Sequence, residues 1–198
     1  MVKEIRLYFE GDARLRPGMS EFLEELRERA RDANCRFRLI ACGNRTLEDF
    51  CDGLHTHPEA HVLALLDSDG PLTEERRRGF FNRRDWDPPA EAGNPADRVF
   101  WMVQVMEAWF LADPEALAAF YGDGFQPRAL RRNPHVEEIP KNDVLESLRK
   151  ASRASRKGGY HKTKHAPALL ARIRADRVRA AAPNCERLFT HVLSLFED

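Results

Sequence analysis

Several familiar functional signals are missing from this sequence. Its four cysteines form no Cys-x-x-Cys pair and share no zinc-like spacing with the seven histidines. The chain also has no Gly-rich phosphate loop, no dinucleotide fingerprint and no Gly-x-Ser-x-Gly elbow. We therefore do not expect it to hydrolyse ATP through a P-loop.

Long apolar runs and an excess of one charge are missing too. No apolar run approaches the roughly 20 residues that a membrane helix needs, and 32 Lys and Arg residues balance 32 Asp and Glu residues. The even balance gives the chain no overall attraction to nucleic acid or to a membrane. The opening MVKEIRLYFEG has the pattern of a strand rather than of a targeting segment. We expect a soluble, cytoplasmic protein with reduced thiols and no membrane partner.

The first half of the chain alternates between strand and helix patterns. The run from His61 to Leu66 is apolar throughout, which is typical of a parallel strand buried on both faces. Expected strands cover residues 3–9, 37–42, 61–66 and 99–105. Expected helices begin at a Ser20 N-cap, at a capping box formed by Thr46 and Asp49, and at Thr73. Residues 70–97 otherwise predict a long polar loop.

The second half is mainly helical in pattern. Asp113-Pro114 is a helix start, with Asp as the N-cap and Pro at the first helical position. Further helices are expected over residues 142–152, 165–173 and 184–196. The pattern predicts an α/β fold: a mostly parallel, open, Rossmann-like sheet with helices on both faces and a helical C-terminal part. We assign 1–112 to the α/β core and 113–198 to a helical extension packed on the same domain.

Acidic residues follow three of the expected strands. Glu10 ends the first, Asp67 and Asp69 end the third, and the fourth runs into Glu107. Ligands of open parallel sheets bind beyond the carboxyl ends of the strands, and hard carboxylate oxygens suit Mg²⁺ or Mn²⁺. The acids therefore predict a metal site. Two other interpretations stay open: Asp-Ser-Asp-Gly is also ordinary turn chemistry, and Glu107 could simply begin a helix.

The combination of Glu-Gly after the first strand with Asp-x-Asp-Gly after a later one resembles the Toprim domain. That domain occurs in topoisomerases, bacterial primases and OLD-family nucleases. The resemblance implies a Toprim-like core in which Glu10, Asp67 and Asp69 bind Mg²⁺ and act in phosphoryl transfer. The full chain is also similar to an uncharacterised bacterial Toprim-like family, in the pieces LRPGMSEFL, LLDSDGP, MVQVMEAWFLADPEAL, IPKNDVLESL and KGGYHKTKHAPALL.

A concentrated basic stretch covers residues 149–164, RKASRASRKGGYHKTK, with seven Lys or Arg and no acid. Such a stretch predicts a polyanionic partner, although solvated charge runs are common. Expected phosphate clamps are Lys157, Lys162 and Lys164. Further candidates for phosphate or nucleic-acid contacts are Arg153, Arg156, Tyr160, His161 and His165, together with Arg14, Arg16 and Arg45 in loops after strands.

The sequence is consistent with three functions. The first is a Mg²⁺-dependent phosphodiesterase or nuclease acting on nucleic acid, which the resemblance places beside a separate ATPase in bacterial defence against phage. The second is a phosphatase of the haloacid-dehalogenase type, because DSDGPLT resembles the nucleophile motif of that family. It would use Asp67 as a nucleophile and leave Glu10 without a role. The third is a non-catalytic Toprim-like protein that binds a partner.

Overall fold

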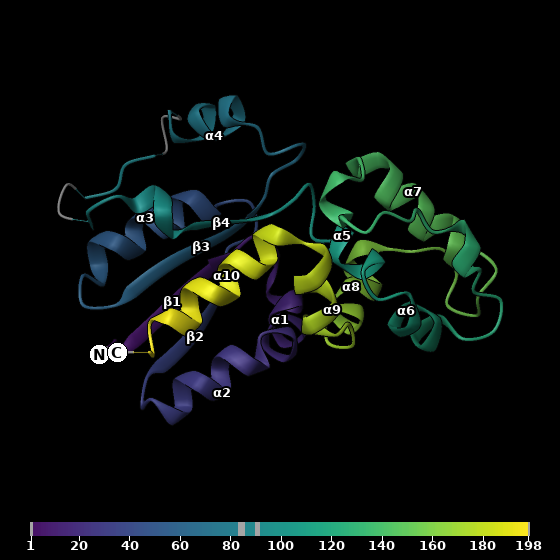
Figure 1. The fold of residues 1–198 in the computed structure, drawn as a ribbon, viewed down its shortest axis with the longest axis horizontal. Coiled ribbons are helices and arrows are strands. Elements are labelled where there is room, and N and C mark those ends of the chain that lie inside the picture. The colour runs from purple at the N-terminus through teal and green to yellow at the C-terminus, as the bar shows by residue number, and fades with distance from the viewer. Residues whose placement is uncertain (1, 83–85, 90–91, 198) are drawn as a thin grey trace.

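A four-stranded parallel sheet forms the centre of the molecule, in a computed structural model that describes residues 2–82, 86–89 and 92–197. The strands are β1 (Glu4–Phe9), β2 (Arg36–Ala41), β3 (His61–Asp67) and β4 (Val99–Met102), in the order β2-β1-β3-β4. Neighbouring strands pair in parallel throughout, with Leu7 opposite both Leu39 and Leu63. The predicted α/β fold with an open parallel sheet is confirmed (Figure 1).

Helices cover both faces of this sheet (Figure 1). α1 (Arg16–Phe22), α2 (Glu24–Asp32) and α10 (Pro183–Ser194) lie on one face, and α3 (Thr46–Thr56) and α4 (Glu74–Phe81) lie on the other. Alternate strand residues point to opposite faces, so Leu63 and Leu65 join one apolar cluster whereas Ala64 and Leu66 join the other. The apolar run of β3 is therefore buried from both sides, as expected.

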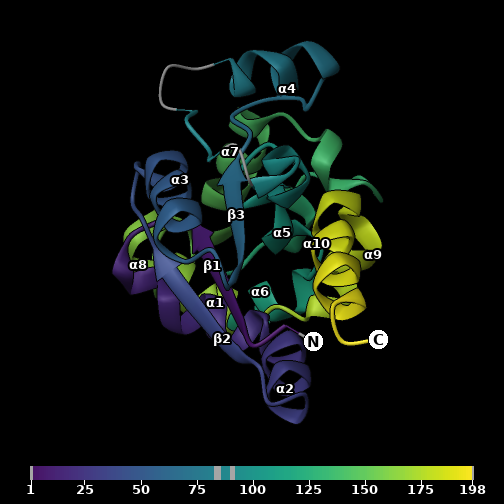
Figure 2. The same ribbon diagram turned by 90° about the vertical axis from the view of Figure 1, so that its left-hand side faces the viewer.

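The remaining helices gather beyond the carboxyl edge of the sheet, where the parallel strands end (Figures 1 and 2). They are α5 (Ala108–Leu111), α6 (Pro114–Tyr121), α7 (Lys141–Ser152), α8 (Lys162–Leu170) and α9 (Ala175–Ala181). One apolar cluster runs from the sheet into these helices and includes Trp109, Leu148 and Leu169, each fully buried. This helical group therefore covers the same edge at which the acidic residues lie.

Local signals placed some helix starts correctly and others wrongly. The side chain of Asp113 accepts a hydrogen bond from the backbone of Ala116, which confirms the predicted N-cap of α6. Ser20, by contrast, lies inside α1, which begins four residues earlier because Pro17 fits the first turn of a helix. The capping box was also wrong: Thr46 is already helical, and its hydroxyl makes no capping bond.

One strand boundary and one helix differ from expectation. The fourth strand ends at Met102 rather than at residue 105, and a cis peptide joins Val103 to Gln104 directly after it. α9 was not predicted at all, since its short sequence ADRVRAA carries only one residue that the core buries fully. Across the described residues, no helix has both the length and the apolar character needed to cross a membrane.

The contact between α1 and α8 requires a glycine. A Cβ at Gly18 would lie 2.3 Å from the carbonyl oxygen of Pro167, well inside van der Waals distance. α8 carries Lys162 at its start, so this close approach helps to bring that lysine to the carboxyl edge.

We predict that Gly18→Ala lowers the free energy of unfolding by about 1–3 kcal/mol, the usual cost of overpacking a core contact. Chemical denaturation would measure it. Gly79→Ala is the control, because Gly79 lies in α4 with no atom within 4 Å of the added methyl group. A Gly18→Ala protein as stable as the wild type would show that the two helices can separate without cost.

Candidate functional site

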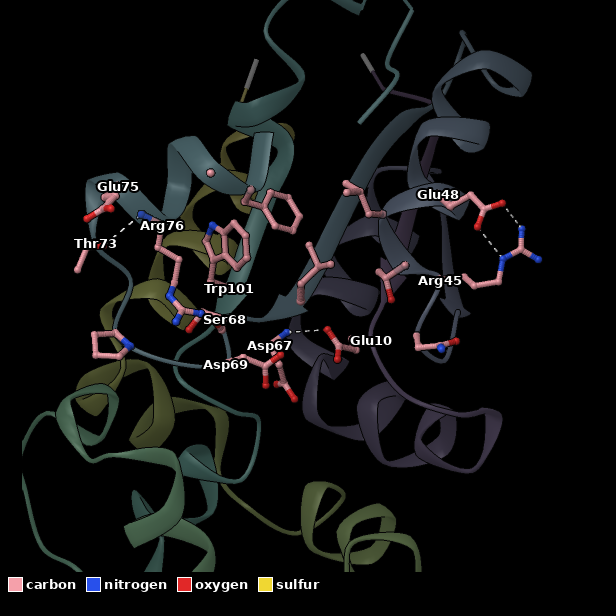
Figure 3. Close-up of a pocket in the computed structure, with 17 residues that line it drawn as sticks. Glu10, Arg45, Glu48, Asp67, Ser68, Asp69, Thr73, Glu75, Arg76 and Trp101 are labelled. Carbon is pink, nitrogen blue, oxygen red and sulfur yellow. Dashed lines mark hydrogen bonds and ion pairs between the residues drawn. The ribbon is translucent and has the colours of Figure 1, made fainter. Parts of the chain in front are cut away.

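The strand order creates a crevice between β1 and β3. The chain passes from β1 to β2 on one side and then returns to β3 on the other, and ligands of open α/β sheets bind at such a switch point. Glu10 follows β1 directly, and Asp67 is the last residue of β3. The backbone N–H of Asp67 donates to the Glu10 carboxylate at 3.1 Å (Figure 3). The two acids are therefore neighbours at the switch point.

Both of these carboxyl groups are held in a poorly solvated place. The Asp67 side chain is only 7% exposed, and its Oδ1 accepts a hydrogen bond from the backbone of Met106 at 2.8 Å. Burial raises the pKa of Asp67 to about 7, and the charges of Glu10 and Glu107 act in the same direction, against that of Lys162. Burial likewise raises the pKa of Glu10, with a smaller contribution from Asp69.

Asp69 occupies the exposed side of the same turn. Its backbone has a positive φ of 55°, and its carboxylate accepts from the Lys141 ammonium at 2.6 Å. Lys141 begins α7, and its backbone N–H donates to the side chain of Gln104 at 3.1 Å. Lys141 lies in the segment IPKNDVLESL, whose sequence alone indicates no role for it, because only the tertiary fold brings α7 to the sheet.

Glu107 lies deeper and is only 1% exposed. It precedes α5 at the N-cap without a capping bond, and its Oε1 accepts from the Tyr160 hydroxyl at 2.9 Å. Its Oε2 is buried and has no hydrogen-bond partner among the described residues. The Lys162 ammonium lies 3.7 Å from Glu107 and equally 3.7 Å from Asp67. Burial alone would lower the pKa of Lys162, but these two carboxylates outweigh it and raise the pKa.

Two of the residues predicted to contact nucleic acid are buried. Tyr160 is only 6% exposed and its hydroxyl is engaged by Glu107, so its ring is not available to stack on a base. His165 is buried as well, and its Nδ1 accepts from the backbone of His161 and lies 3.1 Å from the Tyr121 hydroxyl. Both rings pack in the interior near the start of α8. The surrounding residues are mostly basic and polar, so the sequence pattern does not indicate this burial.

The rest of the basic stretch is ordered and mostly exposed. Residues 149–152 end α7, and the backbone of Tyr160 donates to Ser152 at 2.7 Å, so hydrogen bonds link the turn to the helix before it. Lys157 lies over the Phe120 ring, 4.9 Å from its centroid. All seven of its Lys and Arg side chains are exposed, and so is His161. Of the three predicted lysine clamps, the structure brings only Lys162 to the acids.

The arginines predicted near the acids mostly pair with local carboxylates. Arg14 binds Asp12 at 2.5 Å, and Arg45 binds Glu48 at 2.6 Å. Arg16 is exposed on the first turn of α1. Both Arg14 and Arg16 were expected in a loop. Arg14 instead lies in a short 3₁₀ helix and Arg16 in α1.

The donor chemistry of this edge fits a hard divalent cation. Glu10, Asp67 and Asp69 offer carboxylate oxygens. Burial is the main cause of the raised pKa values of Glu10 and Asp67, and a cation between them would offset the cost of holding both carboxylates charged there. The three carboxylates do not point to one common position. Among the described residues, no three His, Cys, Asp or Glu groups are placed to hold one ion. Asp69 would have to exchange its Lys141 partner for the ion.

Comparison with known proteins assigns the chain to a family. The family described as a domain of unknown function, DUF4276, matches residues 13–193. The chain belongs to the DUF4276 family. The matched region includes Asp67, Asp69, Glu107 and Lys162 and begins three residues after Glu10. No curated protein and no solved structure gives a match.

The raised pKa of Asp67 predicts a pH-dependent stability in metal-free buffer. A carboxyl group with a higher pKa in the folded state favours folding while it is protonated, so its contribution is lost as pH rises from about 4 towards about 7. Asp67→Asn keeps the oxygen that accepts from Met106 and cannot ionise. We expect it to be more stable than the wild type at pH 8, by more than about 1.4 kcal/mol, the equivalent of one pKa unit.

Thermal unfolding of both proteins between pH 4 and 8 with a chelator present would check this. Glu28→Gln, which alters an exposed acid on α2, is the control for a general effect of lost negative charge. Equal pH dependence in the wild type and Asp67→Asn would mean that Asp67 is ordinarily solvated.

Proposed function

We propose that this protein is a Mg²⁺- or Mn²⁺-dependent phosphodiesterase, a nuclease acting on nucleic acid. The observation that carries the proposal is the pair Glu10 and Asp67 at the switch point between β1 and β3, in hydrogen-bond contact and both with raised pKa values. This is the place at which an open parallel sheet binds its ligand. The Toprim resemblance assigns metal binding to the same two residues and to Asp69.

The chain's own groups divide the work around the phosphate. Glu10, Asp67 and Asp69 would hold the cation, which when bound supplies an acidified water and neutralises charge on phosphoryl oxygens. Lys162 is 54% exposed and stays protonated between Asp67 and Glu107, so its ammonium is placed to contact a phosphate oxygen. Its position depends in turn on Glu107, which is fixed by Tyr160.

Glu107 fits a supporting role better than that of a metal ligand. One of its oxygens is engaged by Tyr160, and the Lys162 ammonium lies against the same oxygen. A buried carboxylate beside a lysine keeps that lysine charged. We therefore assign Glu107 to the orientation of Lys162.

A nucleic-acid substrate is favoured by the exposed basic groups of the α7–α8 turn. Arg153 and Arg156 are exposed on the segment that leads to Lys162 at the start of α8. Contacts of this kind supply sequence-independent, salt-sensitive affinity for a phosphate backbone. The further expectation of a separate ATPase partner in defence against phage rests on the resemblance alone.

The phosphatase alternative makes a different use of the same turn. It needs a phosphorylated Asp67 and no contribution from Glu10, whereas Glu10 accepts a hydrogen bond from the Asp67 backbone and shares its crevice. We favour the two-carboxylate metal site for this reason. The non-catalytic alternative predicts no turnover with any metal.

We predict that wild-type protein binds Mn²⁺ in calorimetry and cleaves plasmid or single-stranded DNA or RNA only with Mg²⁺ or Mn²⁺ present. Glu10→Gln and Asp67→Asn should each lower the cleavage rate at least about 100-fold, the scale for losing a group that stabilises transition-state charge. Lys162→Gln should lower the rate while leaving Mn²⁺ binding intact. Lys164→Gln, two residues along α8 and exposed, is its matched control.

Each alternative has its own signature in this experiment. Full activity of Glu10→Gln together with a phosphorylated Asp67 would favour the phosphatase. Absence of metal binding and of cleavage in the wild type would overturn the proposal in favour of a non-catalytic protein. Equal losses in Lys162→Gln and Lys164→Gln would remove the specific role of Lys162.

A further inference from the structure

A cleft of about 940 Å³ extends from the acids between α3 and α4 (Figure 3). Its two ends differ in chemistry. Glu10, Asp67 and Asp69 line one end, and the apolar wall consists of Leu47, Leu66, Phe80 and Trp101. Leu66 directly precedes Asp67 in β3, so the apolar wall begins next to the acidic group. A ligand bound at the acids therefore has an apolar space beside it.

Aromatic rings from two elements build part of this wall. Trp101 belongs to β4 and Phe80 to α4, and their ring centroids are 4.6 Å apart in an edge-to-face arrangement. No residue of α4 is fully buried. α4 therefore packs Phe80 against the apolar cluster from outside and leaves this ring partly exposed at the cleft.

α4 is anchored to the turn that carries the acids. The Arg76 guanidinium donates to the carbonyl oxygen of Ser68 at 2.6 Å. It also passes so close to Gly70 that a Cβ there would lie 2.8 Å from it. The Asp-Ser-Asp-Gly turn and the Phe80 side of the cleft are thus joined through one arginine, which couples the acidic end to the apolar wall.

A polar group without a partner also faces this cleft. The Thr46 side chain is 2% exposed, and its Oγ1 has no hydrogen-bond partner among the described residues. An unpaired buried hydroxyl destabilises a fold, so such groups in a native protein need an explanation. The place of Thr46 in the lining of the cleft gives an explanation, because a ligand there could make the missing hydrogen bond. Asn44 and Arg76 add further polar groups to the same lining.

We propose that this cleft binds the nucleobase of the nucleotide whose phosphodiester lies at the acids. A base is flat and can stack on the partly exposed Phe80 ring, which the buried Trp101 supports edge-to-face. It also carries donors and acceptors on its edge for the Thr46 hydroxyl. An aliphatic ligand would leave that hydroxyl unpaired. The inference rests on the proposed function for the identity of the phosphodiester, but base binding itself can be measured without catalysis.

The test uses uncharged nucleosides, so that neither metal nor phosphate contributes. Adenosine and cytidine are titrated into the full-length protein with a chelator present, with ribose as the ligand that lacks a base. We expect nucleosides to bind at least about tenfold more tightly than ribose, the scale of one base stacked on aromatic side chains. Phe80→Ala should remove most of this difference. Phe125→Ala is the matched control, because Phe125 is a partly exposed ring outside the cleft that stacks on Tyr121.

Thr46→Val supplies a second, sharper readout. Removing an unpaired hydroxyl should leave the free protein as stable as before or more stable, yet weaken nucleoside binding several-fold. Thr56→Val is its control on the same helix, since that hydroxyl already donates to Asp52 at 2.7 Å. The inference would be overturned if nucleosides bound no better than ribose, or if they bound Thr46→Val and Phe80→Ala as tightly as they bind the wild type.

The outcome separates this inference from the proposed function. Loss of nucleoside binding with metal-dependent cleavage intact would remove the base site and leave the nuclease. Nucleoside binding without any cleavage would keep the base site and remove the nuclease. Comparing a mononucleotide with a short oligonucleotide, both with Mg²⁺, then shows whether the base comes from a free nucleotide or from a strand.

Discussion

The hydrogen bond from the Asp67 backbone to the Glu10 carboxylate is the contact on which the rest of this site depends. It joins the ends of β1 and β3 across the switch point of the sheet, at a distance of 3.1 Å. Burial in this poorly solvated crevice raises the pKa of both acids, and the charge of Glu10 raises that of Asp67 further. A crevice of this kind costs stability unless a cation occupies it. That cost is the physical reason to regard the acids as functional and not as ordinary strand ends.

The helical C-terminal part serves the same crevice. α8 approaches α1 at Gly18, where no side chain would fit, and so carries Lys162 to a position between Asp67 and Glu107. α7 brings Lys141 to Asp69 from another direction. Two lysines from distant parts of the chain thus meet acids that follow the strands, and each can be displaced by an incoming cation or used to contact a phosphate.

Periodicity and turn chemistry were sufficient to predict the parallel sheet, the acids at its carboxyl edge and the helical end of the chain. They failed where tertiary packing decides the outcome. Tyr160 and His165 lie in a basic, polar segment, yet both rings are buried. Lys141 and Thr46 are far from Asp67 in the sequence. Arg76 is close to the acids in sequence, yet no local pattern indicates that α4 and α7 converge on one turn. Side-chain contacts of this kind require the fold.

The cleft and the crevice are best understood together. Arg76 of α4 donates a hydrogen bond to the turn that carries Asp67 and Asp69. A ligand that contacts Phe80 therefore contacts the helix that is bonded to this turn. Asp69 is at present engaged by Lys141, and the carboxylates are not converged on one ion. A nucleotide whose base lies against the apolar wall and whose phosphate lies near Lys162 would bring a second anion to this edge. That phosphate would compete with Asp69 for the Lys141 ammonium. That exchange would free Asp69 for a cation, which makes substrate binding and metal binding mutually supportive at this edge.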